Sequence, residues 1–510
     1  MDINGINKNL KICIGIAALL AMVFVVYFAI KSGNKDAVET INIKSEDRQD
    51  TDNDDVEGKD ARNKRKNEAD KSFGKKKKQA GISDKIRVLL SDTAEGYMQS
   101  YVEISCNTSY SVNDGKEITI YDKNDIITIN RDTMEEGSIT IAPNEEQGRL
   151  TISSIKKGGG VPSYRGTLNI TAYESGYIMV NELPVEEYLY GVVSSEVPSD
   201  FDTEALKVQA VCARGFAYKK LDNPSFEEYG ADLDDTTSSQ VYNNFPETDK
   251  AIQAVDETFG IVPVYQDEYI NAFYFSTSCG VTANNSDVWG GDAEEYLDAS
   301  IEDKSAEHAN LSDEKAFRAF IDENIINGDE KIKTFERDLP FYRWTAAYTY
   351  EEMGDAIERG MVMCDSSNLY VLNGENFEQL GGELPAVGDI NSITVTARGD
   401  SGIAKEIVIQ GSENTIKCVG QNDIRHLLYP YDIIITKQDG SEQTSWEMLP
   451  SAFFYVVKDK NSKQYIIKGG GFGHGAGMSQ NGANEMAKQG YTYEEIIKHY
   501  YNGITLKKIE

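Results

Sequence analysis

Residues that bind metal ions or form disulfide frameworks are scarce in this chain of 510 residues, which has six cysteines and four histidines. Cys13 falls in an apolar run, and the other five cysteines are widely scattered: Cys106, Cys212, Cys279, Cys364 and Cys418. The sequence contains no Cys-x-x-Cys pair and no paired histidine spacing. It therefore predicts neither a structural zinc site nor a disulfide framework, although one bridge stays open in an extracytoplasmic compartment.

Positive charge is also in short supply, because 51 lysines and arginines face 84 aspartates and glutamates, for a net charge of −33. Binding to nucleic acid needs a basic surface, so nucleic acid is excluded as a partner. A neutral, polyhydroxylated ligand such as a glycan is compatible with this charge. The 29 tyrosines offer amphipathic faces on which sugars can stack, although tyrosine is equally common in β-sheets.

Charged residues are missing from Ile12 to Ile30, a run of 19 residues flanked by lysines. As a helix rising about 1.5 Å per residue, it would span roughly 28 Å, enough for the hydrocarbon core of a membrane. No clear small-x-small cleavage site follows, which favours an uncleaved signal anchor. We expect a single-pass membrane protein with residues 1–11 in the cytoplasm and the large domain that follows the span extracytoplasmic.

Apolar residues are few in residues 31–80, and no aromatic residue of this segment precedes Phe73. Such a segment cannot bury enough surface to offset the entropy of ordering, so we expect a charged, disordered linker. Its lysine run, Lys75–Lys78, can touch anionic lipid or wall polymer, or can remain part of a solvated tether.

Short runs rich in Ile, Val, Thr and Tyr fill residues 82–181, which predicts a β-rich N-terminal subdomain with a hairpin turn at Asp114-Gly115. Helical patterns follow, and β alternation returns from residue 392. A sheet built before the helices and another built after them favours an α+β fold, with a mixed α/β domain over residues 182–510.

We interpret residues 301–390 as an elaboration around the core of that domain. Ser312 is a candidate N-cap for one helix in this segment. A second helix is expected over residues 349–360, ending at Gly360.

A carboxylate stands at a break between two helical patterns. The first pattern runs from Val185 to about Ser194 and ends before Val197-Pro198, because proline lacks an N–H and disfavours the helical conformation in its predecessor. Asp200 or Asp202 can cap the second helix. Glu196 lies in the break, where it is either a general acid or one of many solvated acidic side chains.

Other candidate ligand contacts come from the second helix and from a polar loop. Lys207 and Arg214 are seven residues apart and share one face of that helix, where they can position a substrate or pack. Gln240 and Tyr242 lie in the loop of residues 233–245 and are candidate sugar contacts.

Six glycines crowd residues 469–477, which permits positive φ angles and close backbone approach. The spacing matches neither a dinucleotide fingerprint nor a phosphate loop. His474, Ser479 and Gln480 lie on or just after this loop. They either contact a ligand or belong to a tight structural turn in which His474 is packed.

Four long motifs occur in a fixed order: LPVEEYLYGVVSSEVPSDFDTEALKVQAVCARGFAY, DTTSSQVY, FYFSTSCGVTANNSDVWGG and GGGFGHGAGMSQNGANEMAKQGYTYEEIIKHYYNGITL. With them the chain resembles the stage II sporulation protein D (SpoIID/LytB) family over about residues 82–510. The resemblance implies a peptidoglycan lytic transglycosylase anchored in the membrane. Such an enzyme cleaves the bond between N-acetylmuramic acid and N-acetylglucosamine in peptide-stripped glycan strands, leaving 1,6-anhydro ends.

The resemblance also implies a physiological setting, which is septal wall degradation during engulfment in sporulation. The expected partners are peptidoglycan strands, a cell-wall amidase and other engulfment proteins. Glu196 matches the family's catalytic acid/base. The alternative is a wall-binding module that enhances an amidase without catalysis.

The chain departs from the family pattern at several positions. Some members carry a Cys/His zinc site around the motif DTTSSQVY, but this chain has neither residue there, so we predict no metal and no cofactor. Gly215-Phe216 and Cys279 replace residues usual in the family.

A transglycosylase of this type needs one carboxylate instead of the usual pair of a glycosidase. We expect the apolar side chains of Val193, Val197 and Tyr190 to raise the pKa of Glu196, so that it is protonated near neutral pH.

Overall fold

The computed structural model describes residues 84–94, 96–299, 310–326, 330–331 and 333–509. The expected cytoplasmic segment (1–11), membrane span (12–30) and linker (31–80) lie outside these residues. Over the ranges that are described, no helix has both the length and the apolar character needed to cross a membrane.

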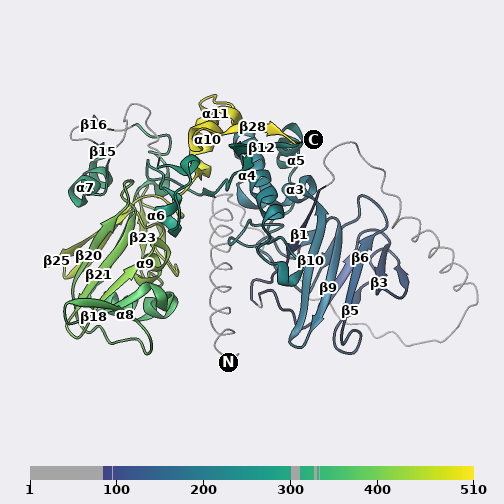
Figure 1. The fold of residues 1–510 in the computed structure, drawn as a ribbon, viewed down its shortest axis with the longest axis horizontal. Helices are drawn as coiled ribbons and strands as arrows, with labels where there is room; N and C mark the ends of the chain where they lie inside the picture. Colours follow the sequence, from purple (N-terminus) through teal and green to yellow (C-terminus); the bar gives the residue numbers. More distant parts are fainter. Residues whose placement is uncertain (1–83, 95, 300–309, 327–329, 332, 510) are drawn as a thin grey trace, which may run out of the picture. The chain divides into compact units, whose positions relative to one another are not determined.

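Contacts divide the chain into two compact units (Figure 1). The first unit holds the described residues up to Ser199 together with Ala217–Ile252, and the second holds Asp200–Phe216 and Gln253–Ile509. The long helix α4 (Thr203–Asp222) therefore contributes residues to both units. Each unit combines sheets with helices, which confirms the expected α+β class.

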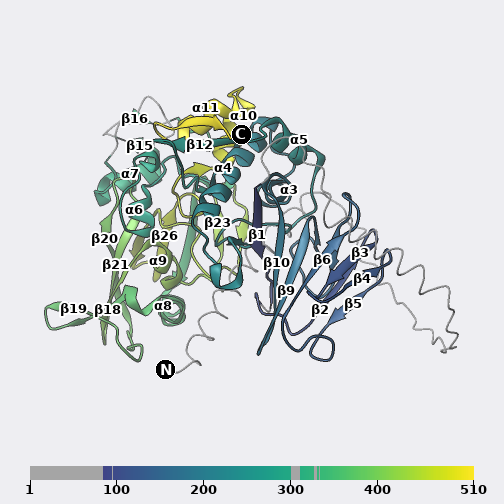
Figure 2. The ribbon, with the colours of Figure 1, turned by 45° about the vertical axis from the view of Figure 1, so that its right-hand side comes forward.

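The first unit is built on a seven-stranded sheet with the order β11-β1-β10-β9-β6-β3-β4 (Figure 2). Its pairs are antiparallel except for β1 and β11, which run parallel. The strands are β1 (Lys85–Leu89), β3 (Tyr110–Asn113), β4 (Ile118–Tyr121), β6 (Ser138–Pro143), β9 (Thr167–Tyr173), β10 (Gly176–Pro184) and β11 (Leu233–Asp234).

The predicted hairpin turn at Asp114-Gly115 is confirmed between β3 and β4. The Asp114 carboxylate accepts hydrogen bonds from the backbone N–H groups of Lys116 and Glu117, both at 2.8 Å. Gly115 has φ +83°, a conformation that side chains with a Cβ rarely adopt.

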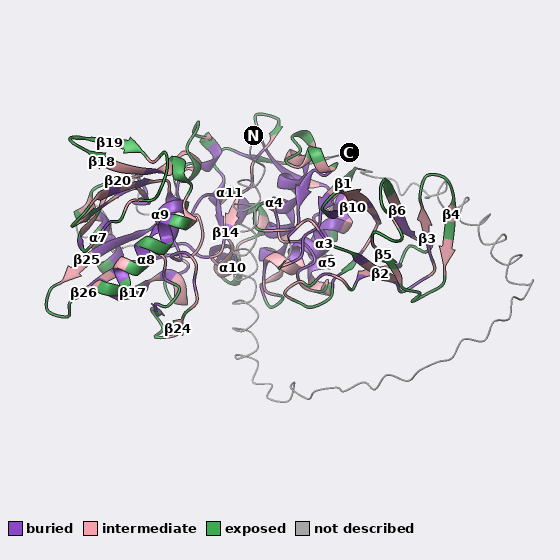
Figure 3. Ribbon diagram, turned by 90° about the horizontal axis from the view of Figure 1, so that it is seen from below, coloured by how far each residue is buried: buried purple, intermediate pink, exposed green. Residues whose placement is uncertain are grey.

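A second sheet of the first unit has the order β5-β2-β7-β8. It comprises β2 (Val102–Cys106), β5 (Ile127–Ile129), β7 (Leu150–Ile152) and β8 (Ser163–Tyr164). Alternate residues of β2 and β7, such as Ile104 and Ile152, are fully buried, whereas many loops of this unit are exposed (Figure 3). This alternation is the pattern from which the sequence predicted strands.

The helix α3 (Val185–Glu196) packs against β1 and β10. The first unit therefore extends past residue 181, where the sequence suggested a boundary, because the buried face of α3 completes its core. Fully buried residues on this face include Tyr188, Leu189, Val192 and Val193.

The second unit contains two five-stranded sheets, with the orders β24-β23-β17-β26-β25 and β19-β18-β22-β21-β20. The helix α8 (Tyr350–Met363) packs against β17 of the first of these sheets. The helix α9 (Gln421–Leu427) packs against β21 of the second. The strands are β17 (Trp344–Thr349), β18 (Leu369–Asn373), β19 (Asn376–Gln379), β20 (Ile390–Arg398), β21 (Ala404–Gly411), β22 (Thr415–Val419), β23 (Ile435–Lys437), β24 (Glu442–Gln443), β25 (Phe454–Asp459) and β26 (Gln464–Gly469).

Three small sheets of the second unit pair β12 with β13 and β28, β14 with β27, and β15 with β16. The parallel pair of β14 and β27 places Phe275 opposite Ser479, so it joins two segments that are far apart in sequence. The strands are β12 (Ile261–Tyr265), β13 (Glu268–Tyr269), β14 (Tyr274–Phe275), β15 (Ile325–Ile326), β16 (Glu330–Lys331), β27 (Met478–Ser479) and β28 (Thr505–Lys508).

The remaining helices are short. They are α5 (Asp249–Glu257), α6 (Asn285–Trp289), α7 (Glu314–Glu323), α10 (Gln480–Lys488) and α11 (Tyr493–Tyr500), with single turns at Glu227–Tyr229, Glu295–Leu297, Pro340–Tyr342 and Ser366–Asn368.

Two predictions about helix ends are wrong. The N-cap of α7 is Asp313 instead of Ser312, since the Asp313 carboxylate accepts from the N–H groups of Lys315 and Ala316. Gly360 does not end α8 but lies inside it. A Cβ at Gly360 would stand 2.4 Å from the carbonyl oxygen of Leu427, so this glycine serves the close packing of α8 on α9.

All five described cysteines are free thiols. Four are buried and Cys364 is half-buried. Cys364 lies within hydrogen-bonding reach of Cys418. This hydrogen bond and burial raise the pKa of the Cys418 thiol.

Candidate active site

Glu196 is the last residue of α3. The helix runs about two residues further than the sequence suggested, so Glu196 lies inside its end and not in the break. It stops there because Val197 adopts an extended conformation (φ −130°, ψ 149°) ahead of Pro198, where the sequence predicts the stop. The Glu196 side chain is half-buried, and its Oε1 accepts a 2.7 Å hydrogen bond from the backbone N–H of Val241. The carboxyl group is thus held at a helix end by a loop from elsewhere in the chain.

That loop, which follows β11, is fastened to the end of α3 by two serines. The Ser195 hydroxyl accepts from the N–H groups of Asn244 (3.0 Å) and Phe245 (3.2 Å). The Ser194 hydroxyl accepts from the N–H of Thr248 at 3.0 Å. Sequence reasoning missed this function of Ser194 and Ser195, for which the only signal was a serine pair at the end of a helix.

Gly191 allows the loop to approach α3 closely. A Cβ at this position would lie 2.4 Å from the Asn243 side-chain oxygen and 2.7 Å from the Tyr242 ring. The glycine therefore lets the loop pass directly over the helix, which helps to bring Val241 to Glu196.

Gln240 and Tyr242 are almost fully buried in this loop. The Tyr188 hydroxyl donates to the Gln240 side-chain oxygen at 3.1 Å, and the Tyr242 hydroxyl donates to Asn181 at 2.8 Å. Burial raises the pKa of both tyrosines well above the usual value, so they stay protonated. These contacts position the loop, and contact of Gln240 or Tyr242 with a sugar stays a prediction.

The base of the loop is fixed by a buried ion pair that sequence reasoning missed. Lys157 Nζ lies 2.6 Å from Asp235 Oδ2, and the two side chains are 6% and 0% exposed. The Ser91 hydroxyl donates to the same carboxylate at 2.6 Å. Burial raises the pKa of Asp235 in spite of the opposing effect of Lys157.

The neighbouring Asp234 accepts hydrogen bonds from the Tyr97 hydroxyl (2.6 Å) and from the Thr236 hydroxyl (2.5 Å). Both aspartates are therefore engaged in structural bonds, and neither forms an exposed pair with Glu196.

The second unit contains the other predicted site residues. Lys207 forms ion pairs at 2.8 Å with Glu204 and with Glu257, and hydrogen bonds to them raise its pKa. Arg214 is fully buried and donates to the carbonyl oxygens of Ile261 (3.0 Å) and Val255 (3.3 Å). Of the two alternatives left open by the sequence, the described contacts match packing.

The glycine-rich loop also packs within the second unit. Ser479 is fully buried, caps α10 and donates a 2.6 Å hydrogen bond to the buried Glu336. Glu336 accepts from the N–H of Ser278 as well, at 2.9 Å. Sequence reasoning missed Glu336, since nothing in its surrounding sequence marks it.

His474 is half-buried, and its two ring nitrogens lie 3.0 Å from the Tyr274 carbonyl oxygen and 3.1 Å from the Ala476 N–H. Burial lowers its pKa to about 4, so the ring is neutral at pH 7. Gln480 lies 3.4 Å from Gln209 and is half-buried. These contacts correspond to the structural-turn alternative, and ligand contact by His474, Ser479 or Gln480 stays a prediction.

Two groups of predicted site residues therefore result. The first unit brings together Glu196, Gln240 and Tyr242, and the second unit contains Lys207, Arg214, His474, Ser479 and Gln480. Within the described ranges, no three His, Cys, Asp or Glu side chains are arranged to hold a metal ion.

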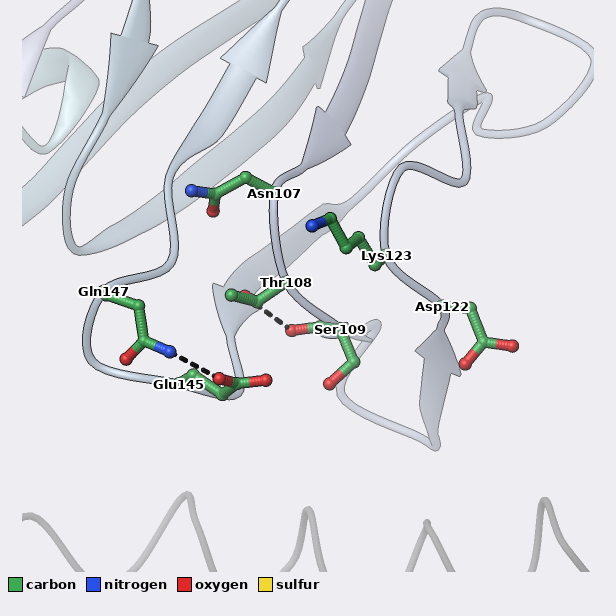
Figure 4. Close-up of a pocket in the computed structure, with 7 residues that line it drawn as sticks. All are labelled: Asn107, Thr108, Ser109, Asp122, Lys123, Glu145 and Gln147. Carbon is green, nitrogen blue, oxygen red and sulfur yellow. Dashed lines mark hydrogen bonds between the residues drawn. The ribbon is translucent and has the colours of Figure 1, made fainter.

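A hollow of about 490 Å³ lies elsewhere in the first unit, among the loops that follow β2, β4 and β6 (Figure 4). It is polar, and Gln147 donates to Glu145 across one of its edges at 2.5 Å. None of its lining residues belongs to α3 or to the loop at Glu196; they are Asn107, Thr108, Ser109, Asp122, Lys123, Glu145 and Gln147.

Comparison with known families adds a second line of evidence. The family described as Stage II sporulation protein matches residues 173–265, which include Glu196 and the loop that contacts it. A domain of unknown function, DUF8618, matches residues 283–477.

Individual proteins are similar over a longer stretch. An uncharacterized protein of Brachyspira hyodysenteriae is 30% identical over 364 residues, which cover 71% of this chain and 75% of that protein. Stage II sporulation protein D of Bacillus subtilis is 27% identical over 381 residues, 72% of this chain and 87% of that protein. The amidase enhancer of Bacillus subtilis is 28% identical over 330 residues, 62% of this chain but 40% of that protein.

Proposed function

The chain belongs to the stage II sporulation protein D family, and from this premise we propose that it is a peptidoglycan lytic transglycosylase with Glu196 as its acid/base. The substrate is the bond between N-acetylmuramic acid and N-acetylglucosamine in peptide-stripped glycan strands. The observation that supports this proposal most directly is the half-buried Glu196 carboxyl, held by Val241 at the end of α3.

The chemistry uses one carboxyl group in two protonation states. Protonated Glu196 donates its proton to the glycosidic oxygen as the bond breaks and positive charge develops on the sugar ring. The resulting carboxylate then removes the proton from the 6-hydroxyl of the same N-acetylmuramic acid, which closes the 1,6-anhydro ring. Because the attacking hydroxyl is part of the substrate, it has the advantage of an intramolecular reaction.

Two features of the site act on the protonation of Glu196 in opposite directions. At the end of α3 its carboxyl group lies at the negative end of the helix dipole, which favours the neutral acid. The hydrogen bond from the Val241 N–H favours the carboxylate. The site thus contains one influence toward each of the two protonation states that the proposed mechanism uses.

The engagement of nearby aspartates favours this single-acid mechanism. Asp234 and Asp235 are buried and bound to Tyr97, Thr236, Ser91 and Lys157. A hydrolase would need a second carboxylate open to the substrate to activate water or form a covalent intermediate. Anhydro ends therefore follow from the chemistry more directly than reducing ends.

We further propose that the membrane span at residues 12–30 anchors the chain with its N-terminus inside the cell and the units outside. In this position the enzyme acts on septal peptidoglycan during sporulation, after a cell-wall amidase has removed the stem peptides. Other engulfment proteins are its expected neighbours.

The experiment incubates the full chain, purified in detergent, with peptide-free glycan strands and identifies the products by mass spectrometry. We expect anhydro-ended fragments from the wild type and a loss of at least about 100-fold in rate for Glu196→Gln, because the amide cannot transfer a proton. Glu187→Gln is the matched control, since Glu187 is a half-buried glutamate in the first turn of the same helix. Reducing-end fragments, or equal rates for Glu196→Gln and wild type, would contradict the proposal.

A second candidate function is enhancement of an amidase, favoured by the similarity to the amidase enhancer of Bacillus subtilis. In that case Glu196→Gln would stimulate amidase release of stem peptides from purified walls as well as the wild type does. Strand cleavage would be absent from both proteins.

A further inference from the structure

One tryptophan of the second unit stands at the protein surface. The chain has three tryptophans. Trp344 and Trp446 are 1% and 3% exposed, whereas Trp289 is 49% exposed. Because single exposed apolar side chains are common on soluble proteins, the surroundings of Trp289 must decide whether its exposure has a function.

Beneath Trp289 lies a cluster of aromatic rings. The Trp289 ring is 4.5 Å from the Phe273 ring and 4.9 Å from the His474 ring, measured between centroids. Phe275 contacts His474 in turn at 5.7 Å. The supporting rings come from β14 with the residue before it and from the glycine-rich loop, so two segments far apart in the sequence support the exposed indole of α6.

His474 is fixed in this cluster by its own hydrogen bonds. The Ala476 N–H donates to Nδ1, which leaves Nε2 to donate its proton to the Tyr274 carbonyl oxygen. The ring is therefore a neutral tautomer that cannot rotate without losing both bonds. A rigid support of this kind holds the indole in one orientation before any ligand arrives, which lowers the entropic cost of binding.

The chain beside the indole leaves open space. Gly290 and Gly291 both have φ +77°, and no heavy atom lies within 4 Å of a Cβ placed at either. The helix α6 that carries Trp289 is held by an ion pair of 2.6 Å between Asp287 and Lys405. The exposed ring thus rests on Phe273 and His474, and the two glycines that follow it have free space at their Cβ positions.

We propose that Trp289 is a stacking platform for a pyranose ring of a β-1,4-linked N-acetylhexosamine strand. A pyranose presents C–H groups on one face and hydroxyls around its rim, which matches the apolar face and polar surroundings of an exposed indole. A neutral N-acetylated sugar also suits a chain whose net charge is −33. The inference rests on the proposed function, and it adds a glycan contact in the unit that does not contain Glu196.

The first test uses the intrinsic fluorescence of the wild-type full chain. Since Trp289 is the exposed member of the three tryptophans, quenching by acrylamide reports mainly on this residue. We expect tetra-N-acetylchitotetraose to change the emission saturably and to protect it from acrylamide. A titration to saturating sugar with neither effect would overturn the inference without recourse to any variant.

The second test measures binding of the same sugar by calorimetry. Trp289→Ala is expected to weaken binding about tenfold, which corresponds to about 1.4 kcal/mol. The affinity of Trp289→Phe for the sugar should lie between those of the wild type and Trp289→Ala, because phenylalanine keeps an aromatic face. Tyr101→Ala is the matched control, since Tyr101 is 46% exposed but lies in the first unit, and its affinity should equal that of the wild type.

Emission from the buried Trp344 and Trp446 checks that Trp289→Ala is folded. A folded Trp289→Ala protein with unchanged affinity would refute the platform. Glu196→Gln separates the two proposals, because it should lose strand cleavage and keep sugar binding. If the wild type also binds the sugar but cleaves no strand, only the proposed function is removed. Strand cleavage by wild type together with unchanged binding by Trp289→Ala would remove only the platform.

Discussion

Two stretches of this chain stood out in the sequence, and their surroundings in the two units are different. In the first unit, Glu196 is half-buried at a helix end, and a distant loop orients its carboxyl group through Val241. In the second unit, the glycine-rich loop packs on its own protein, and both ring nitrogens of His474 are bonded to the backbone. A Cβ at Gly477 would stand 2.1 Å from the carbonyl oxygen of Phe273.

The glycine run and the carboxylate at the end of α3 were both conspicuous in the sequence, but they have different structural causes. A run of glycines indicates close backbone approach, but here the approaching groups belong to the same unit. A carboxylate at a helix end also has a structural contact here, since Glu196 accepts from the Val241 N–H, but its side chain remains partly accessible. In the first unit a loop contact orients the candidate residue, whereas in the second unit the glycine loop packs on its own protein. Substitutions and pH changes in each unit test this contrast.

The largest expected effect comes from breaking the ion pair that fixes the loop of the first unit. Lys157→Met leaves the fully buried Asp235 without its cation, which typically costs about 3–5 kcal/mol of stability. The cost should shrink at lower pH, because the raised pKa of Asp235 lets it become neutral. Hydrogen exchange of peptides from the first unit measures the change.

A control for that variant is Arg359→Met, followed by hydrogen exchange of peptides from the second unit. It breaks the exposed ion pair of Arg359 with Asp432, whose side chains are 55% and 69% exposed. Exposed pairs contribute about 0–1 kcal/mol. Equal effects of the two substitutions would show that the Lys157 pair does not fix the loop.

The next effect concerns the glycine loop of the second unit. Gly477→Ala adds a Cβ against the Phe273 carbonyl at a residue with φ +77°, so steric overlap and backbone strain act together and should cost about 3 kcal/mol. Urea unfolding followed by tryptophan fluorescence measures this unit, because all three tryptophans lie in it.

Gly440→Ala separates strain from overlap. Gly440 has φ +80° but nothing within 4 Å of an added Cβ, so it should lose only about 1–2 kcal/mol. If Gly477→Ala loses no more than Gly440→Ala, the close approach to Phe273 is not what the glycine provides.

The smallest effect per residue is a difference in pH dependence between the units. The three histidines that the structure describes lie in the second unit, and burial lowers the pKa of His474 and of His426 to about 4. A folded-state pKa below the unfolded value of about 6.5 means that stability present above pH 6.5 is lost as the pH falls toward 4. Between pH 7.5 and 5, each histidine should cost the second unit up to about 2 kcal/mol.

The first unit should respond in the opposite direction at Asp235. Its raised folded-state pKa gives a contribution to stability that is greatest at low pH and is lost as the pH rises. Urea unfolding and hydrogen exchange at both pH values compare the units, and His474→Gln should flatten the slope of the second unit only. A parallel loss of stability in both units on acidification would contradict this difference.

Local signals were enough for most of the elements near the candidate site. Proline at 198 ended α3, and the Asp202 carboxylate accepts from the Glu204 N–H at the start of α4. Alternating Ile, Val and Thr residues predicted the strands of the first unit, and Asp114-Gly115 predicted a turn. These features depend on neighbours in sequence, so composition and spacing reveal them.

Spacing misled where the reason for a residue lay in a distant partner. Gly360 looked like a helix end, but it lies inside α8 because α9 passes against it. The choice of Ser312 as a cap failed for a local reason, because the adjacent Asp313 has the carboxylate in the right place and spacing does not distinguish two neighbouring cap residues. Neither outcome depends on the residue alone.

The amino-acid sequence alone indicates that a carboxylate stands where one helix stops before the next, that the chain is too acidic for nucleic acid, and that its motifs follow those of one family. The folded chain is needed to see that Val241 orients Glu196, that Lys157 pairs with Asp235, and that Trp289 rests on His474. The physical reason is that helix ends and strands follow from bonding between near neighbours. Buried ion pairs and ring contacts instead join residues that the chain separates by tens to hundreds of positions.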